Sequence, residues 1–560
     1  MELILVVVGA IVVTAIAHRR GLEPALIIVV IGIAASFIPG FEAPELDSHI
    51  LLTVVLPPLL YSAALDFSFP TFLRNIRPIL GLGVGLVVVT AFTVAAVSSW
   101  LVVVPLTFGT ALVLGAIVAP PDAVTAVAVG RKLGLPRRVM AILTGESLIN
   151  DAAALTLFSI AVAQVAGSHT FIANPVLLFS YSAVVGPLVG AALGLVTLWI
   201  RKRLANPGLE TVQGLLVPFG AYIAAEELHA SGVLAVVVAG FVVGSGTLGA
   251  GYQTRLQERY VWNSVDVLLE AFVFAYIGLH LRFVLEDLRE AHESLTEVGV
   301  AALIVLAIVM LIRPVSVLIM FGRNELSRHV ENRLSVPAPV GGRGALGTRR
   351  RGKPQAKWRA LIDRRSLSWQ ENVVVSWTGM RGVVTLAAAA AIPVLTVDGE
   401  PFPERATIQA IAFVVSVGTL LIQGWTLPLL IRRLRLSTDE SGYEREETLK
   451  AERVVHDAAD EVLTEFRANP PEGLDPRILT EIRNTIARHS QDADEMPDPE
   501  AHTPRAEVFA ALYRDVLAAQ RAALIAERDD GRIEDEAVRA MLERLDLQEA
   551  GVSARLDSRF

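Results

Sequence analysis

The chain has 560 residues, of which 53% are hydrophobic and 19% charged, and it contains no cysteine. A soluble protein of this length has too little interior to enclose so much apolar side chain, so the composition indicates a membrane protein. The lack of cysteine excludes disulfides, thiol catalysis and cysteine-based metal sites. The net charge of −8 combines two unlike parts, because the residues from Leu436 onward carry 30 acidic and 16 basic side chains.

The first apolar run, residues 2–17, predicts a retained membrane span. Its basic cluster, His18-Arg19-Arg20, follows the apolar stretch, whereas a secretory signal carries its positive charge in front. Apolar runs long enough to cross a bilayer recur up to residue 435. We expect 13 spans, near residues 2–17, 24–39, 48–65, 78–104, 106–128, 138–165, 175–200, 210–229, 232–247, 262–284, 297–321, 370–396 and 405–431. Basic clusters follow the odd-numbered spans, which predicts an N-terminus outside and a C-terminal tail in the cytoplasm.

Span 5 contains a helix-breaking sequence, Pro120-Pro121-Asp122. Two consecutive prolines remove two backbone donors and leave carbonyl oxygens free beside the aspartate. Non-helical backbone at this depth is tolerated only where it is buried in protein or lines a wet cavity. Carbonyl oxygens and a carboxylate together predict a site for a hard cation such as Na⁺.

Span 6 carries four polar residues within one turn and a half of helix: Glu146, Ser147, Asn150 and Asp151. Residues four apart share a helical face, so these side chains occupy two adjacent faces. A charged residue at the bilayer centre costs at least about 2.5–3.5 kcal/mol. We therefore expect this cluster to face inward, toward the broken point of span 5.

Two arginines also lie within predicted spans: Arg313 in span 11 and Arg381 in span 12. A positive charge that holds Glu146 in a buried salt bridge leaves Asp122 and Asp151 to bind ions. Either arginine has the charge for this role.

Span 12 has its own breaking signals, since Gly379 and Gly382 flank Arg381 and Pro393 follows. Two interrupted helices at corresponding positions of two halves point to a transporter with inverted repeats. The sequence thus predicts an all-α membrane protein of two inverted-topology repeats in which spans 5 and 12 are interrupted.

The regions outside the spans differ from one another in composition. The loop 323–368 is rich in Gly, Pro and Arg, which predicts a solvated cytosolic loop, with contact to anionic lipid or to the acidic tail as the alternative. In the tail, 436–560, apolar residues spaced by four predict a small cytosolic helical domain. The acidic, proline-containing stretch 491–500 is typical of a linker between its helical parts.

Four motifs in this order resemble one family of ion transporters. They are APPDAV at 119–124, GESLIND at 145–151, the Arg-Pro of span 11 and GMRG at 379–382. The resemblance is to the monovalent cation:proton antiporter-1 (NhaP-type) family, which includes bacterial sodium/proton antiporters and eukaryotic sodium/hydrogen exchangers, and it covers residues 1–435.

This resemblance implies that spans 5 and 12 are unwound helices that cross each other. It also implies a homodimer that works by an elevator-like movement. It implies a dimerisation part at about 1–77 and 175–290 and a moving core part at about 78–165 and 297–431.

Carried over by position, Asp122, Ser147 and Asp151 resemble the family's cation ligands, together with the backbone carbonyl of Pro121. Asn150 matches the first residue of an Asn-Asp pair that the family associates with electroneutral exchange. The chemistry agrees, because an amide cannot ionise and one principal carboxylate then takes either a proton or a sodium ion.

The remaining motif residues resemble structural parts of the same site. Glu146 and Arg313 look like the family's ion pair. Arg381 looks like functional support, together with the glycines that flank it, Gly379 and Gly382.

The chain departs from the family pattern at three positions. Pro121 stands where the family often has threonine, and Ala123 where it usually has proline. Ser62, after Leu59-Leu60-Tyr61, replaces an acid that approaches the cation site in many members, and the nearest acid is Asp66. These departures leave the affinity and the identity of the cation open.

We therefore expect a multi-pass transporter of a prokaryotic inner membrane that exchanges Na⁺ or Li⁺ for H⁺, serves pH homeostasis and needs no cofactor or nucleic acid. A K⁺/H⁺ antiporter of the same fold is the nearest alternative. An intramembrane aspartic protease and a passive ion channel are remote alternatives.

Overall fold

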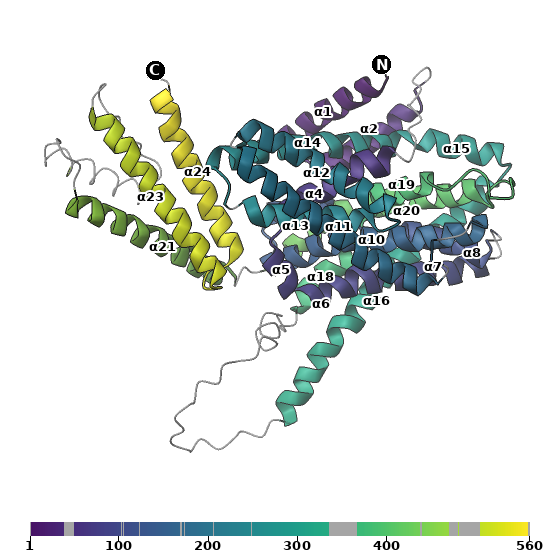
Figure 1. Cartoon of the computed structure of the whole chain (residues 1–560). Coiled ribbons are helices and arrows are strands. Elements are labelled where there is room, and N and C mark those ends of the chain that lie inside the picture. Colours follow the sequence, from purple (N-terminus) through teal and green to yellow (C-terminus); the bar gives the residue numbers. More distant parts are fainter. Residues whose placement is uncertain are drawn as a thin grey trace. The chain divides into compact units, whose positions relative to one another are not determined.

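The structure is a computed structural model, and its described part is helical apart from an isolated antiparallel bridge between Leu395 and Pro401. It describes residues 2–38, 50–101, 104, 106–122, 124–168, 171–172, 174–204, 206–247, 249–334, 367–436, 440–469, 480 and 504–557. Most of the described chain forms one unit of apolar helices, and a second unit contains the tail (Figure 1).

The helices follow the expected segments along the first part of the chain. They are α1 (Glu2–Arg20), α2 (Pro24–Ser36), η1 (Leu51–Val55), α4 (Leu56–Asp66), α5 (Phe69–Arg74), α6 (Ile76–Leu80), η2 (Gly81–Leu86), α7 (Val87–Trp100), α8 (Phe108–Val118), α9 (Val124–Leu133) and α10 (Arg137–Ala166). The two π-helical stretches, η1 and η2, run directly into the α-helices that follow them.

The second part of the membrane region continues in the same way. Its helices are α11 (Pro175–Leu204), α12 (Pro207–Glu227), α13 (Gly232–Thr247), α14 (Tyr252–Leu279), α15 (Leu281–Glu290), α16 (Leu295–Leu334), α18 (Trp369–Trp377), α19 (Val383–Ala390) and α20 (Arg405–Leu434). Six helical stretches among the described residues are by themselves long and apolar enough to cross a membrane. The number of crossings stays a prediction.

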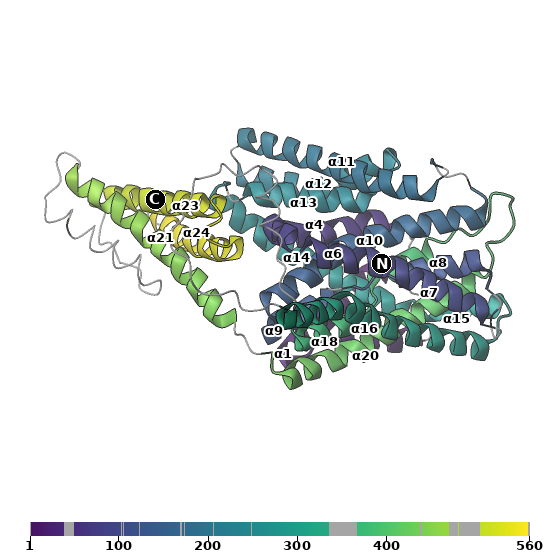
Figure 2. The same cartoon turned by 90° about the horizontal axis from the view of Figure 1, so that it is seen from below.

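Small residues allow helices of this unit to approach closely. Gly186, Gly190 and Gly194 lie on one face of α11, and a Cβ atom on Gly190 would come within 2.0 Å of the carbonyl oxygen of Ala235 in α13. Backbones in contact through glycine are typical of membrane helices, where packing replaces the hydrophobic effect between helices. Helices α11, α12 and α13 are grouped at one side of this unit (Figure 2).

Helix α16 continues to Leu334 and so includes the first residues of the predicted cytosolic loop 323–368, whose place between two spans stays a prediction. The segment from Arg323 to Leu334 has Glu, Leu and Arg and lacks Pro and Gly, so nothing in it ends the helix. The remainder of the predicted loop, 335–366, lies outside the described residues, as do Ala123 and the predicted linker 491–500.

The tail forms a helical bundle of α21 (Glu440–Ala468), α23 (Pro504–Asp529) and α24 (Asp535–Asp557). Its apolar core includes Val455, Leu463, Leu512 and Leu517. Residues 204–211 and 246–260 belong to the same unit.

A buried carboxylate joins parts of this second unit. Arg255 donates from Nε and Nη2 to the two oxygens of Asp546, at 2.6 and 2.5 Å, and Nη2 of Arg521 lies 3.0 Å from Oδ1 of the same carboxylate. Asp546 is 3% exposed, so it is a buried charge shared between two arginines.

Candidate functional site

Two interrupted helices meet at the candidate site. Helix α8 ends at Val118 and α9 begins at Val124, on either side of Pro120-Pro121-Asp122. Helix α18 ends at Trp377 and α19 begins at Val383, so the second interruption falls at the Gly379–Gly382 motif, while Pro393 lies beyond the end of α19. The backbone N–H of Asp122 donates to the carbonyl of Met380 at 2.6 Å. The two interruptions are therefore joined directly.

Arg381 supplies the hydrogen bonds that the interrupted α8 lacks at its C-terminal end. Its Nε donates to the carbonyl of Val118 at 2.9 Å, and its Nη2 donates to the carbonyl of Ala119 at 3.2 Å. Its Nη1 donates to the carbonyl of Gly379. A cation is favourable at a helix C-terminus, where unpaired carbonyls and the helix dipole present negative charge. Arg381 is 1% exposed and thus links the two interruptions from inside the protein.

Gly382 provides the space that the side chain of Asp122 occupies. A Cβ atom at this glycine would lie 2.0 Å from Oδ2, 2.8 Å from Cγ and 2.9 Å from Cβ of Asp122. A Cβ atom essentially never comes within 3.0 Å of a heavy atom outside its own residue and the two neighbours in the chain. The glycine is therefore required for the aspartate to stand in this position.

Asn150 fixes the carbonyl of the first interruption. Its Nδ2 donates to the carbonyl oxygen of Pro121 at 2.5 Å, and the residue is completely buried in α10. A carbonyl oxygen has two lone pairs, so one remains for a further donor or a cation. The amide thus orients the interrupted backbone.

Glu146 and Arg313 form a buried ion pair beside these helices. Arg313 donates from Nη1 and Nη2 to the two carboxylate oxygens of Glu146, the second at 2.8 Å, and from Nε to the carbonyl of Val375 at 2.8 Å. The two residues are 2% and 1% exposed, respectively. This fork-to-fork geometry keeps both charges compensated inside the protein.

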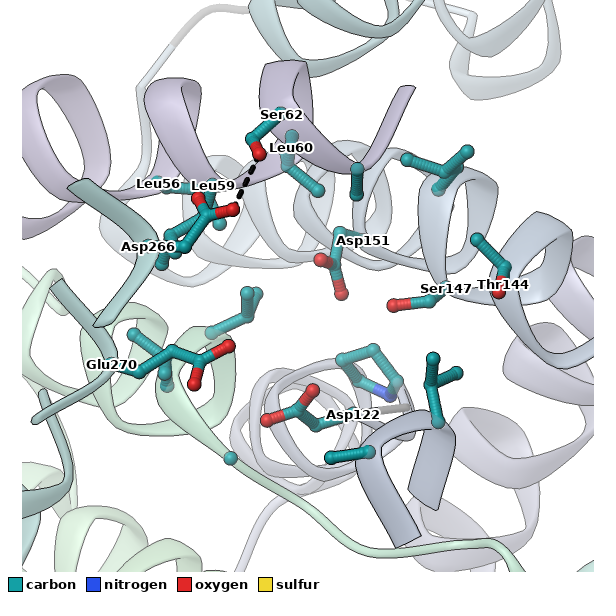
Figure 3. A pocket seen from close by; sticks show the side chains of 18 of the residues that line it. Leu56, Leu59, Leu60, Ser62, Asp122, Thr144, Ser147, Asp151, Asp266 and Glu270 are labelled. Atoms are coloured by element: carbon teal, nitrogen blue, oxygen red, sulfur yellow. Dashed lines mark hydrogen bonds between the residues drawn. The ribbon is translucent and has the colours of Figure 1, made fainter. Parts of the chain in front are cut away.

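A cavity of about 240 Å³ lies between α4, α10, α14 and the two interruptions. Of the site residues predicted from the sequence, Asp122, Ser147, Asp151 and Gly382 line it. The others are not among its lining residues: Pro121, Glu146, Asn150, Arg313, Gly379 and Arg381. Figure 3 shows the side chains of Asp122, Ser147 and Asp151 around the same open space.

Asp151 faces this cavity from α10. It is 6% exposed, and no residue of the described ranges donates a hydrogen bond to it or forms an ion pair with it. Carboxylate, hydroxyl and carbonyl oxygens are the ligands of hard cations, and the wall near Asp151 offers the first two of these kinds.

Neither Asp266 nor Glu270 is among the site residues predicted from the sequence, although both line the cavity from α14. The sequence does indicate a shared position for these two acids, since they are four residues apart and share one helical face inside a predicted span. Ser62, noted only as a departure, donates from its hydroxyl to Oδ2 of Asp266 at 2.5 Å. Asp66 and Arg131 also line the cavity.

Comparison with known proteins identifies the family. Residues 4–433 match the family described as sodium/hydrogen exchanger, transmembrane. The chain is similar to an uncharacterized Na⁺/H⁺ exchanger of Mycobacterium bovis, with 29% identity over 98% of this chain and 95% of that one. It is also similar to the Na⁺/H⁺ antiporter ApNhaP of Aphanothece halophytica, with 28% identity over 81% of this chain and 77% of that one.

The fold resembles a solved structure of the sodium proton antiporter MjNhaP1 from Methanocaldococcus jannaschii. The TM-score is 0.55 at 18% identity, and the match covers 78% of this chain and 98% of that one. The protein is thus an all-helical, multi-span membrane protein, and it belongs to the sodium/hydrogen exchanger family of transporters.

Proposed function

We propose that this protein exchanges Na⁺ or Li⁺ for H⁺ across the membrane and that Asp151 takes either ion in turn. The observation that carries the proposal is the environment of Asp151, which faces the cavity with no hydrogen-bond or ion-pair partner among the described residues. A carboxylate this deeply buried is costly when it is charged and uncompensated. A bound proton or a bound cation each removes that cost.

The other cation ligands in this proposal are Asp122, Ser147 and the carbonyl of Pro121. Asp122 and Ser147 share the cavity with Asp151. The free lone pair of the Pro121 carbonyl, which Asn150 holds in place, supplies a neutral oxygen. Glu146 does not compete for the ion, because Arg313 compensates its charge.

Competition for one carboxylate couples the two ions. Asp151 carries the same net charge with one proton as with one Na⁺, so the exchange is 1:1 and electroneutral. The empty site keeps a buried charge, which makes its movement across the membrane unfavourable. Only the forms with a bound proton or a bound Na⁺ then cross the membrane. The site crosses in one direction with one ion and returns with the other.

The larger architecture in this proposal follows the family resemblance. It has 13 crossings in two inverted repeats, an N-terminus outside and a cytoplasmic tail. A homodimer is held by about 1–77 and 175–290 while the core part, about 78–165 and 297–431, moves as an elevator. The direct contacts between the two interruptions support movement of both as one body, since Asp122 and Arg381 each bond across to the other interruption.

Purified protein in liposomes with an imposed pH gradient and an enclosed pH-sensitive dye tests the function. We expect addition of Na⁺ or Li⁺ to collapse the gradient, at a rate that is unchanged when the membrane potential is clamped. A response to K⁺ alone would assign the protein as a K⁺/H⁺ antiporter instead. A steady ohmic current in planar bilayers would favour a channel. The family assignment already makes the protease alternative wrong.

A further inference from the structure

The wall of the cavity opposite Asp122 carries two acids that the exchange mechanism does not use. Asp266 and Glu270 lie one turn apart on α14 and line the same cavity as Asp122 and Asp151. Figure 3 shows the carboxylates of Glu270, Asp122 and Asp151 directed into one space, with Asp266 at its edge. These acids come from a different helix than either interrupted span.

Asp266 is held in a fixed orientation. The hydroxyl of Ser62, itself 5% exposed on α4, donates to Oδ2 of Asp266 at 2.5 Å. The other oxygen, Oδ1, is buried and accepts no hydrogen bond from the described residues. One carboxylate oxygen is therefore fixed by the protein, and the other has no hydrogen-bond partner among the described residues.

The charge of the cavity determines which ligand fits. The charged side chains in its wall are five acids and one arginine: Asp66, Asp122, Asp151, Asp266, Glu270 and Arg131. This balance repels anions and attracts cations. A volume of about 240 Å³ leaves room for a cation with several of its water molecules.

A second observation points to a cation in this space. Asp151 is 94% buried, faces the cavity and has no hydrogen-bond or ion-pair partner among the described residues. The cavity therefore contains the unpaired carboxylate of Asp151, and the carboxylate of Asp266, which has one unpaired oxygen, lies at its edge.

We propose that Asp266, oriented by Ser62, and Glu270 form a second monovalent-cation position on the route to Asp122 and Asp151. This inference rests on the proposed exchange function for the identity of the ion. A cation held at the α14 acids, partly hydrated, passes across the cavity to the carboxylate of Asp151 as the proton leaves. The second position raises the local cation concentration and so lowers the Na⁺ concentration needed for half-maximal exchange.

The variants Asp266→Asn and Glu270→Gln test the position in the liposome assay at fixed pH. We expect each to raise the half-saturating Na⁺ concentration by about tenfold, as the loss of one charged ligand contact would, with the maximal rate retained. Ser62→Ala keeps the carboxylate of Asp266 but removes the hydroxyl that orients it, so we expect a smaller rise in the half-saturating Na⁺ concentration. Glu286→Gln is the matched control, because Glu286 pairs with Arg282 on the exposed surface of α15.

An unchanged half-saturating Na⁺ concentration in the Asp266→Asn/Glu270→Gln double variant would overturn the second position. If that variant does not elute as folded protein in size-exclusion chromatography, Ser62→Ala is the deciding variant. An unchanged half-saturating Na⁺ concentration in Ser62→Ala would then overturn the second position. Wild-type protein that exchanges none of Na⁺, Li⁺ and K⁺ would contradict the exchange function instead, which keeps the two failures apart.

Binding of ²²Na⁺ to purified protein gives a readout that does not depend on transport. In Asp151→Asn we expect weak saturable binding to remain and to disappear when Asp266→Asn and Glu270→Gln are added. Loss of all saturable binding in Asp151→Asn alone would overturn the proposal.

Discussion

Substitution of Gly382 by alanine tests whether the contact between the two interruptions sets the position of Asp122. The new methyl group would lie 2.0 Å from Oδ2 of Asp122, and Oδ2 must move by at least about 1.0 Å to reach the shortest distance that Cβ atoms adopt. Rotation of the carboxylate alone gives no relief, because Cγ and Cβ of Asp122 are also within 3.0 Å. Asp122 must therefore turn about its Cα–Cβ bond, which moves the carboxylate out of its position, or the backbone of one interruption must shift.

Such a shift is resisted by the hydrogen bond from the N–H of Asp122 to the carbonyl of Met380. A misplacement of about 1 Å at a reacting group reduces a rate on the order of 100-fold, and we expect a loss of this size in Na⁺-driven proton movement.

The assay is gradient collapse in liposomes, with the protein amount matched by size-exclusion chromatography. Gly220→Ala in α12 is the control, since a Cβ atom there has no neighbour within 4 Å. Exchange by Gly382→Ala at a rate within a few-fold of the control would refute the reasoning that this glycine positions Asp122.

Three further predictions concern groups outside the cavity lining and in the tail. Glu146→Gln leaves Arg313 buried without a compensating charge, and we expect a loss of about 3–5 kcal/mol in the free energy of unfolding in detergent; an unchanged unfolding temperature would contradict this. Asn150→Ala removes the donor to the Pro121 carbonyl, and we expect exchange to slow by up to about tenfold, measured in the same liposomes. Asp546→Asn removes the carboxylate that pairs with Arg255 and Arg521, so limited proteolysis should cleave the tail faster, and equal cleavage rates would show that this carboxylate does not hold the bundle together.

Much of the membrane architecture is encoded in local sequence patterns. Apolar runs locate the apolar part of most helices, because burial in lipid requires length and composition and little else. The interruption of span 5 follows from two prolines that lack backbone donors. The inward direction of Glu146 and Asp151 follows from the cost of charge in lipid.

Other features depend on contacts that a single sequence does not reveal. The partners of Arg381 are backbone carbonyls of α8, and every residue has such a group, so the sequence gives no signal for them. Ser62 and Asp266 are 204 residues apart in the chain, and only the fold brings them together. The end of α16 was misplaced because composition averaged over 323–368 concealed the helix-forming residues at its start.

The central claim is that one carboxylate, Asp151, takes the proton and the cation in turn. The most direct test compares Na⁺-driven proton movement by wild-type protein and by Asp151→Asn, reconstituted in liposomes at equal amounts of folded protein. The account predicts that the wild type collapses the pH gradient on addition of Na⁺ and that Asp151→Asn does not, while its elution profile stays that of the wild type. Na⁺-driven proton movement retained in Asp151→Asn would contradict the mechanism.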